Sequence, residues 1–124
     1  MKLTRHTPSD VPFVQRYGRG GFRISGMDFA SSVLILPRGT ETWPVMAHEE
    51  LTVDALAPLI AVADTLDVCL LGCGARMRPL GRELRLALKD AGVAMDPMDT
   101  GSACRTYNVL VSEGRAVAAA LIAF

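Results

Sequence analysis

The residues that could do chemistry are concentrated in two short segments of the 124-residue chain. Residues 72–78 contain two glycines, a thiol and two arginines, and they follow a short apolar run. Residues 98–108 contain a carboxylate, a thiol, a guanidinium and a tyrosine around an expected helix start. In α/β folds, ligands bind where strands end and helices begin, because the first N–H groups of a helix are unpaired and attract anions. One interpretation is therefore a small-anion or small-ligand pocket, with or without catalysis, between segments 72–78 and 100–105.

That pocket would be formed by glycines, charged residues and a hydroxyl of the two segments: Gly72, Gly74, Arg76, Asp99, Thr100 and Arg105. The alternative is a tight strand-to-helix turn that needs glycine for its backbone, with Asp99 accepting hydrogen bonds before the helix. A dinucleotide-binding glycine pattern is incomplete, because Met77 occupies the place of the third glycine.

A catalytic thiol is the other chemistry to consider. Cys104 lies near an expected helix start, where the pKa of a thiol can fall. A nucleophile also needs a base, and neither His6 nor His48 is near Cys104 in the sequence. Cys69 and Cys73 have a spacing that indicates zinc only weakly without further ligands. The sequence therefore favours a small buried Cys104, a protein without metal or cofactor, and a non-catalytic role.

A basic stripe is the candidate surface for protein contacts. Its members recur at spacings of four, three and four residues along one predicted helix: Arg78, Arg82, Arg85 and Lys89. Such a stripe can bind an acidic partner, an anionic membrane or RNA, or it can simply be solvated. Because 13 basic residues balance 13 acidic ones, the chain does not resemble a general nucleic-acid binder.

The predicted strands precede and then alternate with the helices. Glycine-rich turns separate the first strands, and apolar runs at 33–36 and 68–71 predict strands covered on both faces. Pro44 would confine its strand to an edge, and Pro97 is expected to end another. The expected strands are residues 13–17, 22–25, 29–36, 43–46, 68–71, 93–95 and 115–124.

Three helices complete the pattern. The first spans residues 53–65, is capped by Thr52 and is interrupted at Pro58. The second begins at Pro79 and ends before Gly92, and the third is capped by Ser102 and ends at Gly114. The order predicts one α/β domain over residues 1–124, with a largely parallel sheet and antiparallel strands added early. Residues 1–12 are expected to form an extended arm.

The location follows from what the sequence lacks. No apolar run reaches the roughly 18–20 residues of a membrane helix, and polar residues stand where a signal peptide would be apolar. Three cysteines are an odd number without paired spacing, so we expect reduced thiols and a cytoplasmic protein.

Four stretches together carry a resemblance to a known family: residues 20–24, 32–37, 70–74 and the run from 98 to 115. They resemble the small α/β domain family that includes mitochondrial NADH dehydrogenase (complex I) assembly factor 3 and many proteins of unknown function. Cys73 departs from the pattern, because relatives often carry threonine there.

This resemblance implies a three-layer fold whose central mixed sheet has five strands, with the last strand antiparallel to the others. It also implies a non-catalytic protein that helps to build a membrane respiratory complex. The expected partners are then a respiratory-complex subunit or a co-assembly factor, with peripheral contact to the membrane and without a transmembrane segment.

Overall fold

The computed structural model describes residues 11–124, so most of the predicted arm at 1–12 lies outside the described residues. Its helices are α1 (Ala57–Ile60), α2 (Arg82–Asp90) and α3 (Thr100–Ser112), with single 3₁₀ turns at His48–Glu50, Asp54–Leu56 and Ala63–Thr65. Its strands are β1 (Val14–Gly18), β2 (Gly21–Ile24), β3 (Met27–Phe29), β4 (Ser32–Leu36), β5 (Gly39–Trp43), β6 (Val68–Gly72), β7 (Met95–Met98) and β8 (Val117–Leu121).

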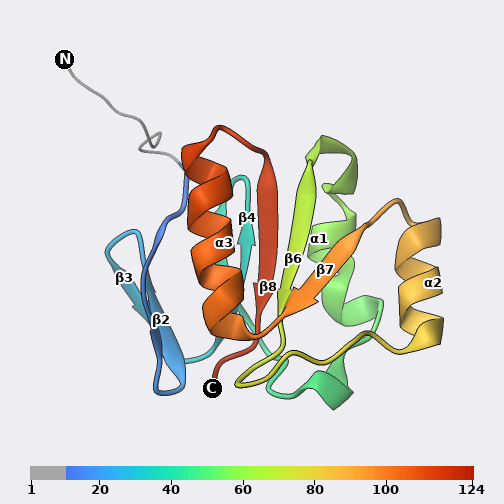
Figure 1. Cartoon of the computed structure of the whole chain (residues 1–124), viewed down its shortest axis with the longest axis horizontal. Helices are drawn as coiled ribbons and strands as arrows, with labels where there is room; N and C mark the ends of the chain where they lie inside the picture. Colours follow the sequence, from blue (N-terminus) through green and yellow to red (C-terminus); the bar gives the residue numbers. More distant parts are fainter. Residues whose placement is uncertain (1–10) are drawn as a thin grey trace.

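The strands form a mixed five-stranded sheet in the order β5-β4-β8-β6-β7 and a small antiparallel sheet of β1, β2 and β3 (Figure 1). The α/β class and the five-stranded mixed sheet are therefore confirmed. The predicted direction of the last strand is wrong in part, because β8 is antiparallel to β4 but parallel to β6. The strand that runs against the other four is β4. Connections through α2 and α3 cross over the sheet and return the chain in the same direction, which makes β6, β7 and β8 parallel.

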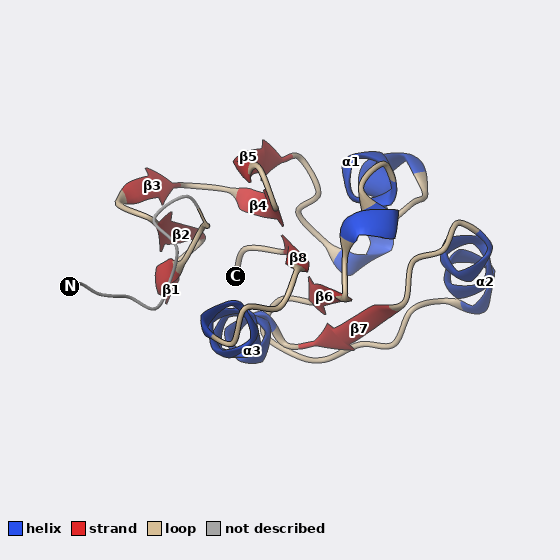
Figure 2. Cartoon of the chain, turned by 90° about the horizontal axis from the view of Figure 1, so that it is seen from above, coloured by secondary structure: helices blue, strands red, loops and turns tan. Residues whose placement is uncertain are grey.

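Helices cover both faces of the five-stranded sheet, which gives three layers (Figure 2). One face packs against α3 and the small sheet, through side chains that include Val33, Leu70 and Tyr107. The opposite face packs against the α1 region and α2, through a core that includes Leu34, Leu71 and Leu88. The strands β4, β6 and β8 are buried on both faces, as the apolar runs in β4 and β6 predict.

Pro58 and Pro79 both lie close to helix starts. Pro58 lies in the first turn of α1, so the predicted 53–65 helix is broken into α1 and two 3₁₀ turns. Thr52 accepts a hydrogen bond from Ala55 N at 3.0 Å, as its predicted capping role requires. Pro79, in contrast, precedes α2, and the helix begins after the extended residue Gly81 rather than at the proline.

Strand boundaries differ from the predictions in three places. The predicted 29–36 strand is divided into β3 and β4, and the strand near Pro44 comes earlier, as β5. Pro97 lies inside β7 instead of ending it. Cys73 N donates to Met98 O at 2.8 Å, so the backbone N–H and C=O of Met98 point toward β6. Because these groups alternate in direction along a strand, the backbone of the neighbouring Pro97 points toward the open edge. A proline is tolerated there because its missing N–H removes no bond of the sheet.

Candidate functional site

The segments 72–78 and 100–105 lie directly against each other, where β6 ends and α3 begins. Thr100 N donates to Gly74 O at 2.9 Å, and Gly74 N donates to Thr100 Oγ1 at 2.8 Å. Thr100 Oγ1 in turn donates to Ile122 O at 2.7 Å, after β8. The Thr100 hydroxyl therefore accepts from one backbone group and donates to another, and it ties together the carboxyl ends of two neighbouring strands.

Gly72 is the residue that permits this close approach. A Cβ at position 72 would lie 2.8 Å from Thr100 Oγ1 and 2.9 Å from Thr100 Cα, which is closer than van der Waals contact allows. Gly74 has φ near +97°, a conformation that favours glycine. Two surface hollows within residues 11–124, described below, are lined by other residues. These observations agree with the interpretation that the glycines serve the backbone.

Asp99 caps α3, which corrects the prediction that Ser102 does so. Ser102 N donates to Asp99 Oδ1 at 2.8 Å, and Ser102 Oγ donates to Asp99 Oδ2 at 2.8 Å. These hydrogen bonds, with the nearby guanidinium of Arg105, hold the pKa of Asp99 below its ordinary value. The Asp99 carboxylate is therefore a helix cap that stays ionised, not a general acid.

The two arginines of the predicted pocket have different surroundings. Arg105 donates hydrogen bonds to Tyr17 Oη and to Ser102 Oγ, the latter at 3.2 Å, and its guanidinium carbon lies 6.0 Å from the Tyr17 ring centroid. Arg76 is exposed and takes part in none of the side-chain hydrogen bonds or ion pairs found in residues 11–124. Within residues 11–124, the hydrogen bonds of Arg105 go to Tyr17 and Ser102 and do not lead to Arg76, so the ligand-binding interpretation stays a prediction.

All three thiols are buried. The Cys104 side chain is about 1% exposed, and burial raises the pKa of its thiol to about 12. Burial likewise raises the pKa of Cys69 to about 11 and that of Cys73 above its ordinary value. The prediction of a small buried Cys104 is confirmed. In residues 11–124, no group of three histidine, cysteine, aspartate or glutamate side chains is placed to hold a metal ion.

The basic stripe is shorter than predicted. Arg82, Arg85 and Lys89 are exposed on α2, and none of them forms an ion pair within residues 11–124. Arg78 precedes the helix and pairs with Glu49 at 2.8 Å. Its hydrogen bond holds the pKa of Glu49 below the ordinary value. Arg78 is separated from the other three because α2 begins only at Arg82.

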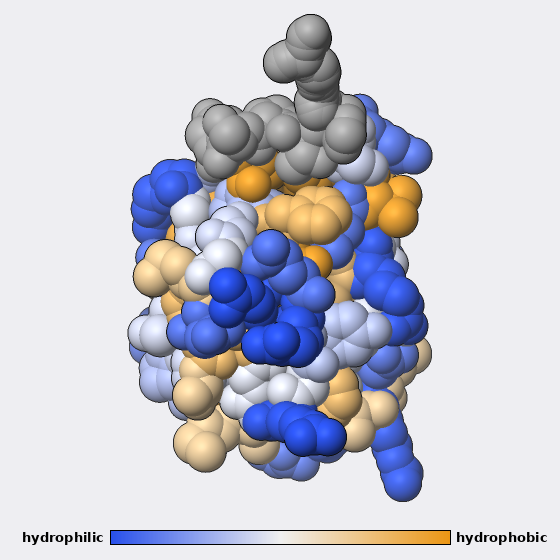
Figure 3. Space-filling view, turned by 90° about the vertical axis from the view of Figure 1, so that its left-hand side faces the viewer, coloured by the Kyte–Doolittle hydropathy of each residue, from blue (hydrophilic) through white to orange (hydrophobic). Residues whose placement is uncertain are grey.

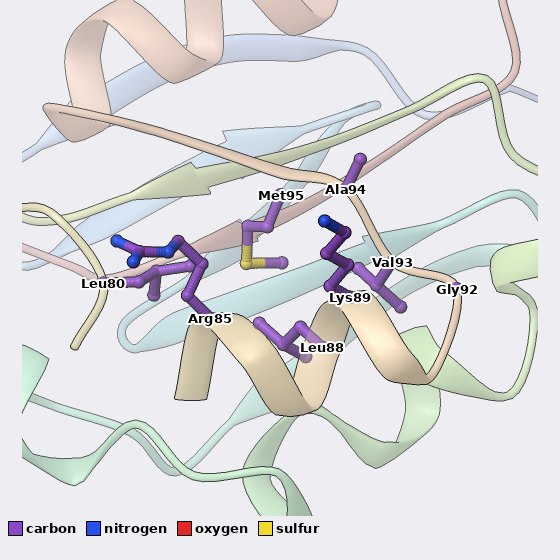
Figure 4. Close-up of a pocket in the computed structure, with 8 residues that line it drawn as sticks. All are labelled: Leu80, Arg85, Leu88, Lys89, Gly92, Val93, Ala94 and Met95. Carbon is purple, nitrogen blue, oxygen red and sulfur yellow. The ribbon is translucent and has the colours of Figure 1, made fainter. Parts of the chain in front are cut away.

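A groove lies between α2 and the edge strand β7, and we call it the α2–β7 groove (Figure 4). Arg85 and Lys89 extend from α2 on either side of Met95, and Leu88 lies between them on the helix (Figure 4). The sequence does not indicate this groove, because it depends on the space left between two elements. Its volume is about 330 Å³, and it is lined by Leu80, Arg85, Leu88, Lys89, Gly92, Val93, Ala94 and Met95.

A second hollow lies on the face formed by the small sheet, where hydrophilic residues gather between apolar ones (Figure 3). Its volume is about 730 Å³, and its lining includes Arg16, Tyr17, Arg19 and Asp28. Asp28 pairs with Arg23 at 3.0 Å and with Arg16 at 3.7 Å. Because its carboxylate already compensates part of the positive charge, this hollow is a weaker candidate for an acidic partner than the α2–β7 groove.

The chain matches a family that is described as protein of unknown function (DUF498/DUF598), over residues 14–122. It is 36% identical over 109 residues to zebrafish (Danio rerio) NADH dehydrogenase [ubiquinone] 1 alpha subcomplex assembly factor 3, covering 88% of this chain and 63% of that protein. The human protein of the same name is 28% identical over 122 residues, with 98% and 66% covered. The chain thus spans about two thirds of the length of these relatives. An uncharacterized protein of Rhodobacter capsulatus is 40% identical over 109 residues, with 88% and 82% covered.

Solved structures share the fold. A crystal structure described as an outer membrane protein from Bartonella henselae has a TM-score of 0.85 at 34% identity, covering 93% of this chain and 97% of that one. The solution structure of a Bordetella pertussis protein, described as an Mth938-like domain, has a TM-score of 0.78 at 29% identity, with 98% and 92% covered. Within residues 11–124, no helix is long and apolar enough to cross a membrane.

Proposed function

Since the chain belongs to the DUF498/DUF598 family, we propose that it is a non-catalytic protein-interaction module that helps to assemble a membrane respiratory complex. The observation that carries this proposal is its similarity to relatives named as complex I assembly factor 3, over nearly all of the chain. The proposed partners are therefore a subunit of that complex or a second assembly factor, met at the membrane surface.

The chemistry of the two central segments supports a role without catalysis. The groups there that could react are already engaged, since the Thr100 hydroxyl binds two backbone groups and Asp99 caps α3. The Cys104 thiol has its pKa raised to about 12, so it is protonated at neutral pH and is a poor nucleophile.

The proposed contact surface is the exposed side of α2. Arg82, Arg85 and Lys89 present positive charge there, and Leu86 is 45% exposed beside them. Charged residues around exposed apolar side chains are typical of surfaces that recognise another protein. We also infer a cytoplasmic location, because all three cysteines are unpaired, as expected in a reducing compartment.

The test is deletion of the gene in a bacterium that encodes both this chain and complex I. We expect less assembled complex I on native gels and lower NADH–quinone oxidoreductase activity in membranes. An epitope-tagged copy should restore both and should recover complex I subunits or a co-assembly factor after mild solubilisation. Unchanged complex I levels together with no recovered subunit would contradict the proposed function.

A further inference from the structure

We propose that the α2–β7 groove binds an acidic segment of a partner protein, which inserts one apolar side chain between Arg85 and Lys89. This inference rests on the proposed function as an interaction module, and it specifies the chemistry of the segment that the module recognises. Three features of the groove carry it: an apolar floor, two cations at the sides, and no carboxylate in the lining.

The floor of the groove is apolar and firmly held. Leu88 and Val93 are 1% and 3% exposed, and Leu80 is 7% exposed, so these side chains belong to the core below the groove. Met95 packs against the same core from β7 and is only partly buried. A volume of about 330 Å³ is at the low end for ligand pockets, which suits one inserted side chain better than a cofactor.

Both charged side chains that line the groove are positive. Arg85 and Lys89 are exposed, line the groove and form no ion pair within residues 11–124. The acidic residues nearest in sequence do not line it. Asp96 follows Met95 in β7, and because side chains alternate along a strand it faces the opposite side of the sheet. The groove is therefore complementary to an apolar residue with carboxylates on both sides.

The same charges argue against a nucleic acid or a membrane as the occupant. A polyanionic surface is usually bound by many phosphate contacts, whereas α2 also carries Glu83 and Asp90 among its three cations. The two lining cations stand on either side of an apolar centre (Figure 4). Such an arrangement favours a short segment whose apolar anchor fills a pocket and whose charges meet the rim.

The probe for this inference is a capped pentapeptide with one leucine between two pairs of glutamates, titrated into the isotope-labelled full chain. Backbone amide shifts should move in α2 and in residues 92–95 and should saturate. Two control peptides, one with lysines in place of the glutamates and one with glycine in place of the leucine, should leave these shifts unchanged. The double variant Arg85→Glu/Lys89→Glu should weaken binding by about tenfold or more.

Arg38→Glu is the control, because Arg38 is an exposed cation between β4 and β5 that lies outside α2 and does not line this groove. It should bind the glutamate peptide nearly as well as the parent, and the amide spectrum itself shows whether each variant is folded. Equal shifts with the lysine peptide, shifts confined to another surface, or unchanged binding in the folded double variant would overturn the inference. So would shifts in α2 that arise only with anionic phosphatidylglycerol vesicles.

The two proposals fail separately. The peptide titration does not depend on complex I, so a negative titration with a positive gene deletion would overturn the groove and leave the proposed function standing. A specific titration with a negative deletion would retain the groove as a peptide-binding site and contradict the assembly role.

Discussion

Asn108 binds both backbone groups of Val14: its Oδ1 accepts from Val14 N at 2.9 Å, and its Nδ2 donates to Val14 O at 2.7 Å. The side chain thus takes the place of a neighbouring strand along the outer edge of β1. The preceding residue of α3 supplies a further contact, since Tyr107 Oη donates to Pro12 O at 2.7 Å. These bonds attach the small sheet to the main one through α3.

Replacing Asn108 should therefore loosen the small sheet. We expect Asn108→Ala to lower the free energy of unfolding by roughly 1–3 kcal/mol, because it leaves two partly buried backbone groups without partners. Urea denaturation followed by circular dichroism measures this change. Ser112→Ala, an exposed substitution on the same helix, should cost much less. Equal stability of the two variants would show that the Asn108 contacts contribute little.

Gly72 should tolerate no side chain. We expect Gly72→Ala to destabilise the fold by about 1–3 kcal/mol, because the added Cβ would meet the backbone of Thr100 at 2.9 Å and force α3 away from β6. The matched control is Gly81→Ala, where a Cβ would meet nothing within 4 Å. Thermal unfolding of both variants measures the difference. If Gly72→Ala had the same unfolding temperature as the parent, α3 would be able to shift away from β6 without cost.

Asp99 should make the protein sensitive to acid. Its pKa is lowered in the fold by the hydrogen bonds from Ser102, so its contribution to stability is present above its unfolded pKa of about 3.9. That contribution is lost as the pH falls through the lower folded pKa. Asp99→Asn keeps a capping side chain but removes the charge, so its stability should fall less steeply below pH 4.

Denaturation with urea at a series of pH values between about 2 and 6 tests this prediction. Asp64→Asn, which removes an exposed carboxylate in a 3₁₀ turn, is the control and should keep the acid dependence of the parent. Parallel stability profiles for the parent and Asp99→Asn would contradict the proposed electrostatic role of Asp99.

The native thiols should be unreactive. Cys104 and Cys69 have pKa values raised to about 12 and about 11, and both side chains are almost fully buried. We expect no labelling by 5,5′-dithiobis(2-nitrobenzoic acid) at neutral pH until urea unfolds the chain, after which all three cysteines should react. Ser112→Cys places a thiol at an exposed position of α3 and should react at once. Rapid labelling of Cys104 in the native parent would contradict its burial.

Much of the fold can be predicted because local rules and tertiary structure agree. Apolar runs identify β4 and β6 as strands covered on both faces. The glycines that end α2 and α3, Gly92 and Gly114, have positive φ angles of 83° and 81°, as glycines after helices often do. The prediction failed at Pro97, because a proline is compatible with a strand when that strand lies at an edge. Strand order cannot be read from a local pattern.

The candidate site is predictable to a smaller extent. Because parallel strands end at the same edge of a sheet, the meeting of segments 72–78 and 98–108 follows from the order of elements. The order of elements does not predict which residue caps α3. Asp99 and Ser102 are both good capping residues, and only the helix start distinguishes them. The bond between Asn108 and Val14 joins residues 94 positions apart, and neither carries a local signal.

The proline in β7 also limits how copies of the chain can associate. Two β7 residues, Met95 and Pro97, point their backbone polar groups toward the open edge of the sheet, and only Met95 has an N–H group there. A second chain arriving there would find too few donors to continue the ladder. Fibril growth by pairing the sheet edge of one copy with that of another is thus obstructed at β7 by a single proline, even at high protein concentration.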